Sequence, residues 1–354
     1  MSSPSNPSSS RSSPTSRRWT WLIGLAVTAA LLAWVLQDVN LREVVAYARG
    51  ADPGLLLLSV LLATATFPLR TIRWRLILRD AEGRAFPWMP LWHATAIGFM
   101  ANNLLPARAG EVARAYVAQR HLPVRFTTAL GSVGVERVFD ALLMLALMAV
   151  AIVAPSFPAN TAVQGRSLSG LASAAALLFG AILLVALLVV HRPAPWLALL
   201  GRVTHRFLPA RVADRLTHWA EGIVDGLAVL KSPARFAGVV AWSIVVWVVN
   251  AAAFAVCFRA FGLDVPLEAA LLLQGIIGFG VAVPSTPGFV GVFEAATRVT
   301  LAVYAVDPSR AVSYALTYHL TTFIPITLLG LWSLSRLRLR LGELRGGNGG
   351  GAGT

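Results

Sequence analysis

The sequence predicts an all-α fold, a polytopic membrane helix bundle with two inverted re-entrant or broken helix hairpins, and three observations lead there. Of the 354 residues, 56% are hydrophobic and 13% are charged, whereas a soluble domain carries about 25% charged residues. Six apolar runs approach or exceed the roughly 20 residues needed to cross a bilayer. Clustered prolines and glycines interrupt two further stretches. A soluble fold could not bury this much apolar surface.

The six predicted spans cover residues 19–37, 54–69, 127–154, 168–190, 236–261 and 311–334. They define one transmembrane domain over 18–340, because such a bundle folds as a unit. Residues 1–17 are rich in Ser and Pro and residues 341–354 are rich in Gly, so we expect both ends to be disordered. Apolar residues at helical spacing over 203–230 predict an amphipathic helix at the membrane surface, which either packs on lipid headgroups or docks a partner protein.

The basic residues form no continuous groove, which argues against a nucleic-acid partner despite the net charge of +14. They fall mainly in the connections between apolar runs. We place both termini, the connections around 70–88 and 191–235, and the segment 106–125 on one side. That side then holds 23 of the 30 Lys and Arg residues, the other side holds five, and two lie within helices. Because loops rich in Lys and Arg stay in the cytoplasm, we expect a multi-pass protein of the cell membrane with both termini cytoplasmic.

Two stretches, 89–121 and 266–306, are predicted to break as helices because of residues near their centres. These residues are Asn102, Asn103 and Pro106 in the first stretch, and Pro284, Pro287, Gly288 and Gly291 in the second. A break frees backbone groups that hydrocarbon cannot satisfy, so each break must face protein or water. With the topology above, the first hairpin opens to the cytoplasm and the second to the outside. Paired broken elements of this kind point to a binding site near the middle of the membrane.

A helix that carries an acid and an arginine follows each break. Glu111 and Arg114 are three residues apart, and Glu294 and Arg298 are four apart, so each pair shares a helix face and can form an ion pair. We expect the free amides at both helix starts to favour an anion. Lipid phosphate is the abundant anionic group of a membrane, which makes a lipid headgroup the first ligand to propose.

Three charged residues, Glu136, Arg137 and Asp140, lie inside the apolar run 127–154. A charge at the bilayer centre costs roughly 2.5–3.5 kcal/mol, so all three must face the bundle interior or water. They form either an internal salt-bridge cluster or part of a polar path. Arg137, with Arg108 and Arg114, could add charge-assisted contacts to phosphate oxygens; the competing interpretation of Arg108 and Arg114 is plain cytoplasmic anchoring.

Five stretches carry a resemblance to a known family: TIRWRLIL, NNLLPARAGEVARAY, GVERVFDALL, VPSTPGFVGVFEAA and YHLTTFIPITLLG. Together they resemble the flippase-like transmembrane domain of lysylphosphatidylglycerol synthases, which also occurs as a stand-alone membrane protein. The resemblance covers about residues 20–335. It implies lipid translocation through a central cavity built by two re-entrant elements.

The sequence also departs from the pattern of these synthases. Their soluble aminoacyl-transferase domain does not follow Arg345 here, so we expect no lysyl transfer. Relatives often show a Gly-Gly pair after the proline of the second break, where this chain has Pro287, Gly288 and Phe289. His319 stands where relatives often carry an arginine, which implies a weaker anion contact at that position.

The candidate substrate-binding residues are the polar, charged and helix-breaking residues of the two breaks and of the charged helix. They are Asn102, Asn103, Arg108, Gly110, Glu111, Arg114, Glu136, Arg137, Asp140, Pro287, Gly288, Gly291, Glu294, Arg298 and His319. Four of the acids, Glu111, Glu136, Asp140 and Glu294, are also candidates for proton coupling. We predict no catalytic residue, no metal ligand and no cofactor. The expected partners are membrane lipids, with a cytoplasmic synthase or a second copy of the chain as further candidates.

The leading hypothesis is therefore an integral membrane flippase that moves a phospholipid or related lipid headgroup across the membrane through a central polar cavity. One alternative is a membrane-embedded lipid-modifying transferase. Another is a non-transporting subunit that docks a synthase through residues 203–230. The sequence contains no GxxxxGK[ST], HExxH or GxSxG motif, which favours a transporter over an enzyme.

Overall fold

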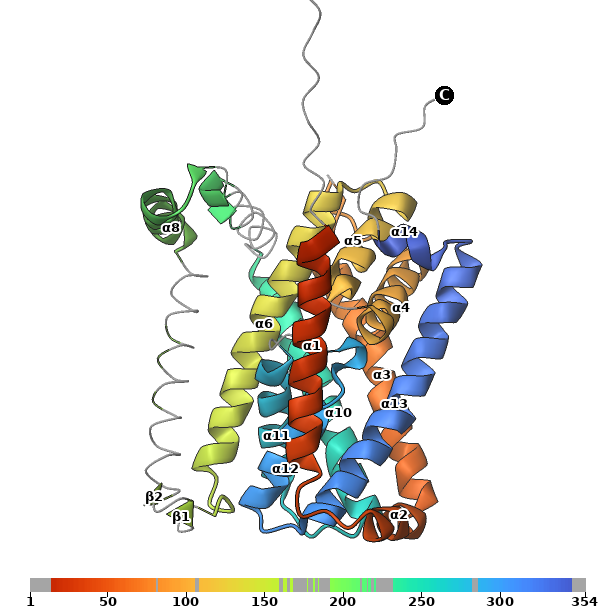
Figure 1. Ribbon diagram of the computed structural model, residues 1–354. Coiled ribbons are helices and arrows are strands. Elements are labelled where there is room, and N and C mark those ends of the chain that lie inside the picture. Colours follow the sequence, from red (N-terminus) through yellow and green to blue (C-terminus); the bar gives the residue numbers. More distant parts are fainter. Residues whose placement is uncertain are drawn as a thin grey trace, which may run out of the picture.

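The computed structural model describes residues 14–80, 82–105, 108–158, 162–163, 166–167, 177, 181, 184, 192–210, 212–214, 216–217, 220, 232–281 and 286–345. Over these residues the chain is an all-α helix bundle, as the sequence predicts (Figure 1). The strands in this part of the chain are a two-residue antiparallel pair, β1 (Ala162–Val163) and β2 (Arg166–Ser167). The fold is that of a polytopic membrane protein.

Five long helices run the height of the bundle (Figure 1): α1 (Pro14–Val35), α3 (Pro53–Ile77), α6 (Phe126–Val153), α10 (Pro233–Ala260) and α13 (Pro308–Arg336). Among the described residues, α3, α10 and α13 are long and apolar enough to cross a membrane. The 25 residues of α3 reach about 38 Å at about 1.5 Å per residue, against a bilayer core of about 30 Å. Helix α6 is as long as α10, but it contains the three charged residues predicted above.

Five of the six predicted spans overlap these long helices. The sixth, 168–190, lies outside the described residues except for positions 177, 181 and 184. The second span was predicted to end at residue 69, but α3 continues to Ile77 and carries Arg70 and Arg73 inside the bundle. The prediction was wrong there because it treated these arginines as loop residues, whereas both find partners on neighbouring helices.

Local sequence signals fix where several helices begin. Asp52 precedes Pro53 of α3, and its side chain accepts a hydrogen bond from the backbone amide of Leu55. Asp307 precedes Pro308 of α13 and accepts from the amide of Arg310 in the same way. A capping side chain satisfies an amide that has no partner within the helix, and proline fits the first helical position because it has no amide hydrogen.

Two helical hairpins lie within the frame of long helices. The first joins α4 (Trp88–Leu104) to α5 (Ala109–His121), and the second joins α11 (Leu267–Gly280) to α12 (Val292–Val303) through a short 3₁₀ turn, η2 (Pro287–Phe289). The longest of the four helices has 17 residues, or about 26 Å, so none reaches across a bilayer core of about 30 Å. The first hairpin lies in the upper part of the bundle and the second in the lower part (Figure 1).

Each hairpin is enclosed by its own cluster of buried apolar side chains. One cluster joins α4 and α5 to the upper ends of α3, α6 and α13, with Trp74, Leu91 and Ile97 fully buried. The other joins α11 and α12 to the lower half of α10 and the start of α13, around Phe258 and Tyr314. The two breaks therefore approach each other from opposite ends of the bundle.

The chain ends differ in part from the prediction. Helix α14 (Leu341–Arg345) lies in the segment predicted to be disordered. It is ordered because Leu344 is buried against the α4–α5 cluster and Glu343 pairs with Arg120 at 3.3 Å. Helix α1 starts at Pro14, inside the predicted N-terminal tail. The remainder of both tails, 1–13 and 346–354, lies outside the described residues.

The predicted amphipathic helix over 203–230 is not one continuous helix. Helix α8 (Pro193–Phe207) starts ten residues before it and ends where Leu208 takes an extended conformation ahead of Pro209. The residue before a proline is biased away from helical geometry, which explains the end at this point. Helical residues follow at 212–214, 216–217 and 220, and the rest of the segment lies outside the described residues.

Candidate functional site

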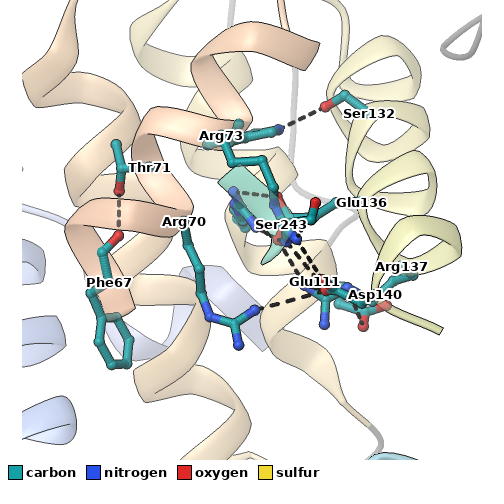
Figure 2. Close-up of polar contacts among 12 residues, drawn as sticks. Phe67, Arg70, Thr71, Arg73, Glu111, Ser132, Glu136, Arg137, Asp140 and Ser243 are labelled. Carbon is teal, nitrogen blue, oxygen red and sulfur yellow. Dashed lines mark hydrogen bonds and ion pairs between the residues drawn. The ribbon is translucent and has the colours of Figure 1, made fainter. Parts of the chain in front are cut away.

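A cluster of charged side chains from α3, α5 and α6 occupies the interior of the bundle (Figure 2). Its centre is Arg73 of α3, which lies 3.0 Å from Glu136 and donates to Oδ1 of Asp140 at 2.5 Å. Arg73 also donates to Oγ of Ser243 on α10 at 3.1 Å. The side chains of Arg73 and Glu136 are 0% exposed. The charges predicted inside α6 therefore face the bundle interior, and helix α3 supplies their main partner.

Arg114 on α5 holds the other side of Glu136. Its two terminal nitrogens donate to the two carboxylate oxygens at 3.0 Å each, the bidentate geometry that suits arginine and a carboxylate. The guanidinium also stacks on the ring of Trp74, 3.8 Å from the ring centroid. The indole of Trp74 in turn donates to Oγ of Ser132 at 2.9 Å. Arg114 is thus a buried structural partner, so the interpretation of this residue as a cytoplasmic anchor was wrong.

The cluster becomes accessible toward the first break. Arg137 contacts Glu136 at 2.7 Å and Asp140 at 3.2 Å, and lies 4.0 Å from Glu111. Glu111 pairs with Arg108 at 2.8 Å. About a third of each of the side chains of Arg108, Glu111 and Arg137 is exposed. A ligand can therefore meet the cluster at this edge, whereas its centre is closed.

Arg70 is the least satisfied cation of the cluster. It lies 3.8 Å from Oδ2 of Asp140 and donates no hydrogen bond to any described residue. Its guanidinium lies between two aromatic rings, 4.7 Å from the centroid of Trp247 and 5.4 Å from that of Phe99. Arg137 contacts the same oxygen, Oδ2 of Asp140, so both guanidinium groups lie next to this atom.

The charges of the cluster do not cancel. Five arginines (Arg70, Arg73, Arg108, Arg114 and Arg137) face three carboxylates (Glu111, Glu136 and Asp140), which leaves a net charge of +2. The Nε atoms of Arg73, Arg114 and Arg137 are buried without a hydrogen-bond acceptor among the described residues. Buried charge without compensation is unfavourable, so the arrangement favours an additional anion.

The first break is held by side chains of α4. Asn102 accepts a hydrogen bond from the backbone amide of Gly110 at 2.9 Å, and Asn103 donates to Oγ1 of Thr327 on α13 at 3.0 Å. Helices α4 and α5 pack so closely that a Cβ atom at Gly110 would collide with the carbonyl oxygen of Gly98. Arg108 adopts the left-handed conformation just before α5. Pro106 lies outside the described residues.

The second break is held by α12, α13 and α1. The amide of Gly291 donates to Oε2 of Glu294 at 2.6 Å, and the ring of His319 contacts Oε1 of Glu294 at 2.6 Å and the carbonyl of Gly288 at 2.9 Å. Thr28 of α1 donates to the carbonyl of Val290 at 3.2 Å. The positive φ angles of Gly288 and Gly291 suit glycine, which carries no Cβ. Pro284 lies outside the described residues.

The two breaks lie next to each other. Arg108 of the first break donates a long hydrogen bond of 3.5 Å to the carbonyl of Val281, at the end of α11. A Cβ atom at Gly288 would lie 3.5 Å from the backbone carbonyl oxygen of Asn103. Helix α4 contacts η2, to which Pro287 and Gly288 belong. The structure therefore brings the candidate residues of both breaks together near the charged cluster.

Two expectations about the pairing of these residues were wrong. Glu111 pairs with Arg108 and not with Arg114, because Glu136 offers Arg114 a buried bidentate partner. Glu294 pairs with His319 and not with Arg298.

Arg298 lies apart from the other candidates. It donates to the carbonyls of Trp34 and Val35 and stacks on the Trp34 ring, so it anchors the end of α1. At the two helix starts, one backbone amide each already has a partner. The amides of Gly110 and Gly291 are not free for an anion, because Asn102 and Glu294 accept from them.

Sequence reasoning missed Arg70, Arg73, Ser243 and Trp247. A signal for the two arginines was present. Arg70 and Arg73 are three residues apart and Glu136 and Asp140 are four apart, so each pair lies on one face of its helix and the two pairs can face each other. Ser243 and Trp247 lie on α10, and Trp247 donates to Oδ1 of Asp140 at 2.9 Å. No feature of the sequence distinguishes these two from other residues of that apolar helix.

The cluster can bind an anion with several oxygen atoms, since guanidinium groups donate to phosphate and carboxylate in fixed geometry. Within the described part of the chain, no three His, Cys, Asp or Glu side chains gather in a way that could hold a metal ion. The fold and this site define an integral membrane helix bundle with a buried, positively charged centre between two opposed broken hairpins.

The chain belongs to the family of the lysylphosphatidylglycerol synthase transmembrane region, whose family model matches residues 21–330. It is similar to the glycosyltransferase AglD of Haloferax volcanii, with 29% identity over 350 residues that cover 92% of this chain and 55% of that protein. Two UPF0104 membrane proteins of Methanothermobacter thermautotrophicus are each 24% identical and covered over 93% and 92% of their length. The chain thus spans about half of the Haloferax relative and nearly all of the other two.

Proposed function

We propose that this chain is a lipid translocase of the cell membrane, which moves a phospholipid or related anionic lipid headgroup past the charged cluster. The observation that carries the proposal is the net charge of +2 among the five arginines and three carboxylates of the cluster, which lies beside two facing helix breaks. A membrane offers one abundant anion to such a centre, the lipid phosphate. Residues of the membrane-spanning helices have little other reason to keep an unbalanced charge.

In this proposal the phosphate enters at the partly exposed edge formed by Arg108, Glu111 and Arg137. It then lies against Arg70, whose guanidinium donates no hydrogen bond to a described residue. The two hairpins are re-entrant and open to opposite sides of the membrane, with both termini cytoplasmic. Because Arg108 and Val281 connect the hairpins, displacement of one hairpin changes the access of the other.

Reconstitution in liposomes tests the proposal. Fluorescent phospholipids in the inner leaflet are protected from an impermeant quencher until they cross, so the rate of quenching reports translocation. We expect Arg70→Met to slow translocation at least about tenfold, the ratio that corresponds to one lost hydrogen bond to a charged group. Methionine retains the apolar contacts with Phe99 and Trp247, so the variant should fold.

Arg84→Met is the matched control, because the Arg84 side chain is 73% exposed in the connection between α3 and α4. We expect it to translocate lipid at the wild-type rate. Protein-free vesicles with the same rate as the wild-type protein would contradict the proposal. Equal slowing by both variants would contradict the role of Arg70.

A second candidate function rests on the Haloferax relative, whose name is that of a glycosyltransferase. In this case the same cluster binds the phosphate of a lipid that carries or accepts a sugar. Incubation of the purified protein with a radiolabelled nucleotide sugar and a lipid phosphate distinguishes the two functions. Sugar incorporated into lipid supports the transferase, and lipid movement without incorporation supports the translocase. A cytoplasmic synthase or a second copy of the chain remains a proposed partner for either function.

A further inference from the structure

His319 of α13 has a hydrogen-bond acceptor next to each of its two ring nitrogens. Nε2 lies 2.9 Å from the backbone carbonyl oxygen of Gly288, and Nδ1 lies 2.6 Å from Oε1 of Glu294. The second carboxylate oxygen of Glu294 accepts from the amide of Gly291 at 2.6 Å. The side chain of Glu294 is 2% exposed and that of His319 is 17% exposed, so water does not readily replace these contacts.

Proton counting shows that neutral histidine with an ionised carboxylate cannot make both contacts. A neutral imidazole has one N–H group and one lone pair. A carbonyl oxygen only accepts, so Nε2 must carry a hydrogen. A contact of 2.6 Å between Nδ1 and Oε1 then needs a second hydrogen, either on Nδ1 or on the carboxyl group. The pair therefore holds one proton more than neutral histidine and a carboxylate hold.

We propose that His319, Glu294 and the carbonyl of Gly288 form a binding site for one proton, and that this proton fastens the second break to α13. When the proton leaves, one ring nitrogen of His319 presents a lone pair to an oxygen that can only accept, and that contact is lost. Either Gly288 of η2 or Glu294 of α12 then loses its attachment to His319 of α13, while Thr28 of α1 still holds Thr286 and Val290.

The surroundings offer the pair no other charge partner among the described residues. On α12, Arg298 is one turn from Glu294, but its guanidinium donates to the carbonyls of Trp34 and Val35. Two aromatic rings lie beside the His319 ring: Phe293, at 4.8 Å between centroids, and Phe323, at 6.4 Å.

Titratable groups on the other elements that pack around α13 have different partners. Tyr318 of α13 stacks on Phe293, and Cys257 of α10 is buried in the same apolar cluster. On α4, His93 lies against Trp332, more than three helical turns along α13. Arg70 and Arg73 of α3 face Asp140. On α2 (Leu41–Gly50), Glu43 accepts from Asn40 near the start of α13. Neither η2 nor residues 24–35 of α1 contain a titratable side chain.

Glu294→Gln gives a variant in which the same contacts need no extra proton. The amide oxygen of glutamine can accept from the Gly291 amide, and its NH₂ group can donate to Nδ1 of a neutral imidazole. Nε2–H of that imidazole still donates to the carbonyl of Gly288. The variant should therefore fold and keep the second break attached whatever the pH.

Hydrogen–deuterium exchange of the detergent-solubilised protein tests the site. Exchange of peptides from 286–303 is compared between wild type and Glu294→Gln at a series of pH values from acidic to alkaline. The chemical effect of pH on exchange is the same in both proteins and cancels in their ratio. We expect wild type to become at least about tenfold faster than the variant as pH rises, as for the loss of one charged hydrogen bond. Identical pH dependence in both proteins would overturn the proposal.

Nitrogen NMR of ¹⁵N-histidine-labelled protein gives an independent readout, with His319→Gln to assign the His319 signals. We expect shifts of a doubly protonated ring, or of a ring with Nε2 protonated and Nδ1 in a strong hydrogen bond, at acidic pH. An unprotonated Nε2 at acidic pH, where the peptides from 286–303 exchange slowly, would overturn the proposal. Neither measurement involves lipid, so the proton site can fail or stand independently of the translocase. Only the further step, that lipid movement follows the proton, rests on the proposed function.

Discussion

At the scale of single residues, the stability of the charged cluster depends on the number of charged donors that each carboxylate accepts from. Asp140 accepts from Arg73 and from the indole of Trp247, and Glu136 accepts from Arg73, Arg114 and Arg137. A carboxylate with several charged donors can remain ionised in the interior. The cost of removing such a donor is high because the carboxylates stay buried without it.

Arg73→Met should destabilise the protein by about 3–5 kcal/mol, since it leaves Glu136 and Asp140 short of their shared partner. Thermal unfolding in detergent, followed by circular dichroism, measures the change. Arg84→Met is again the control, because exposed ion pairs such as those of Arg84 with Asp80 and Glu82 contribute about 0–1 kcal/mol. If both variants unfold at the same temperature, the cluster does not stabilise the fold.

Residue-level predictions from the sequence succeeded where charge stood out against an apolar background. Glu136 and Asp140 were recognisable because a charge inside a long apolar run needs an internal partner. Arg70 and Arg73 were missed because they follow the apolar run of α3, where arginine also occurs as a membrane anchor. Only their burial against α6 distinguishes the two roles.

At the scale of elements, close packing of short helices shapes the first hairpin. Glycines at 98 and 110 let the backbones of α4 and α5 approach, and a Cβ at Gly98 would lie 2.9 Å from the carbonyl oxygen of Gly110. Small residues at helix contacts are common in membrane bundles for this reason. The hairpin therefore tolerates no larger side chain at this crossing.

Gly110→Ala should destabilise the protein by about 1–3 kcal/mol, because the added methyl group forces α4 and α5 apart and disturbs the cap from Asn102. Gly201→Ala is the matched control. It lies in α8 with no atom within 4 Å of the added Cβ, and alanine favours the helix by about 0.5–1 kcal/mol. Thermal unfolding of both variants checks the prediction, and an unchanged midpoint for Gly110→Ala would contradict the close packing.

At the scale of the whole molecule, the basic residues mark one end of the bundle. Helices α5, α8 and α14 lie at the upper end, whereas α2, β1 and β2 lie at the lower end (Figure 1). The upper end corresponds to the side to which the sequence assigned 23 Lys and Arg residues. Arg70, Arg73 and Arg114 of this set are buried, so 20 basic residues remain to indicate the orientation in the membrane, against five at the lower end. The asymmetry still predicts a cytoplasmic upper end.

Single cysteines at Glu82 and Asp264 should be accessible from opposite sides of the membrane. Glu82 lies between α3 and α4, and Asp264 between α10 and α11, and both are exposed. In intact cells an impermeant maleimide should label Asp264→Cys, and Glu82→Cys only after permeabilisation. The parent protein is the control, because its native Cys257 is buried. The reverse labelling pattern would contradict the cytoplasmic assignment.

The sequence by itself determined the class of the molecule and the position of its irregular parts. Apolar runs, proline and glycine clusters and buried charges are local features, and a bilayer imposes the same demands on every segment that enters it. Hydropathy therefore gave five of the described long helices, and the positions of Asn102 and Gly291 gave the two breaks. The end of α3 and the order of the last helix were not determined this way, since both depend on contacts with distant residues.

Only the tertiary structure decided which charges meet. Local spacing predicted pairs within one helix, Glu111 with Arg114 and Glu294 with Arg298. The observed partners lie 22 residues away for Arg114 and 25 for Glu294, and 67 residues separate Arg73 from Asp140. A buried partner from another helix prevails because ion pairs strengthen as water is excluded, and the packing of helices, not their sequence spacing, sets which side chains share that dry interior.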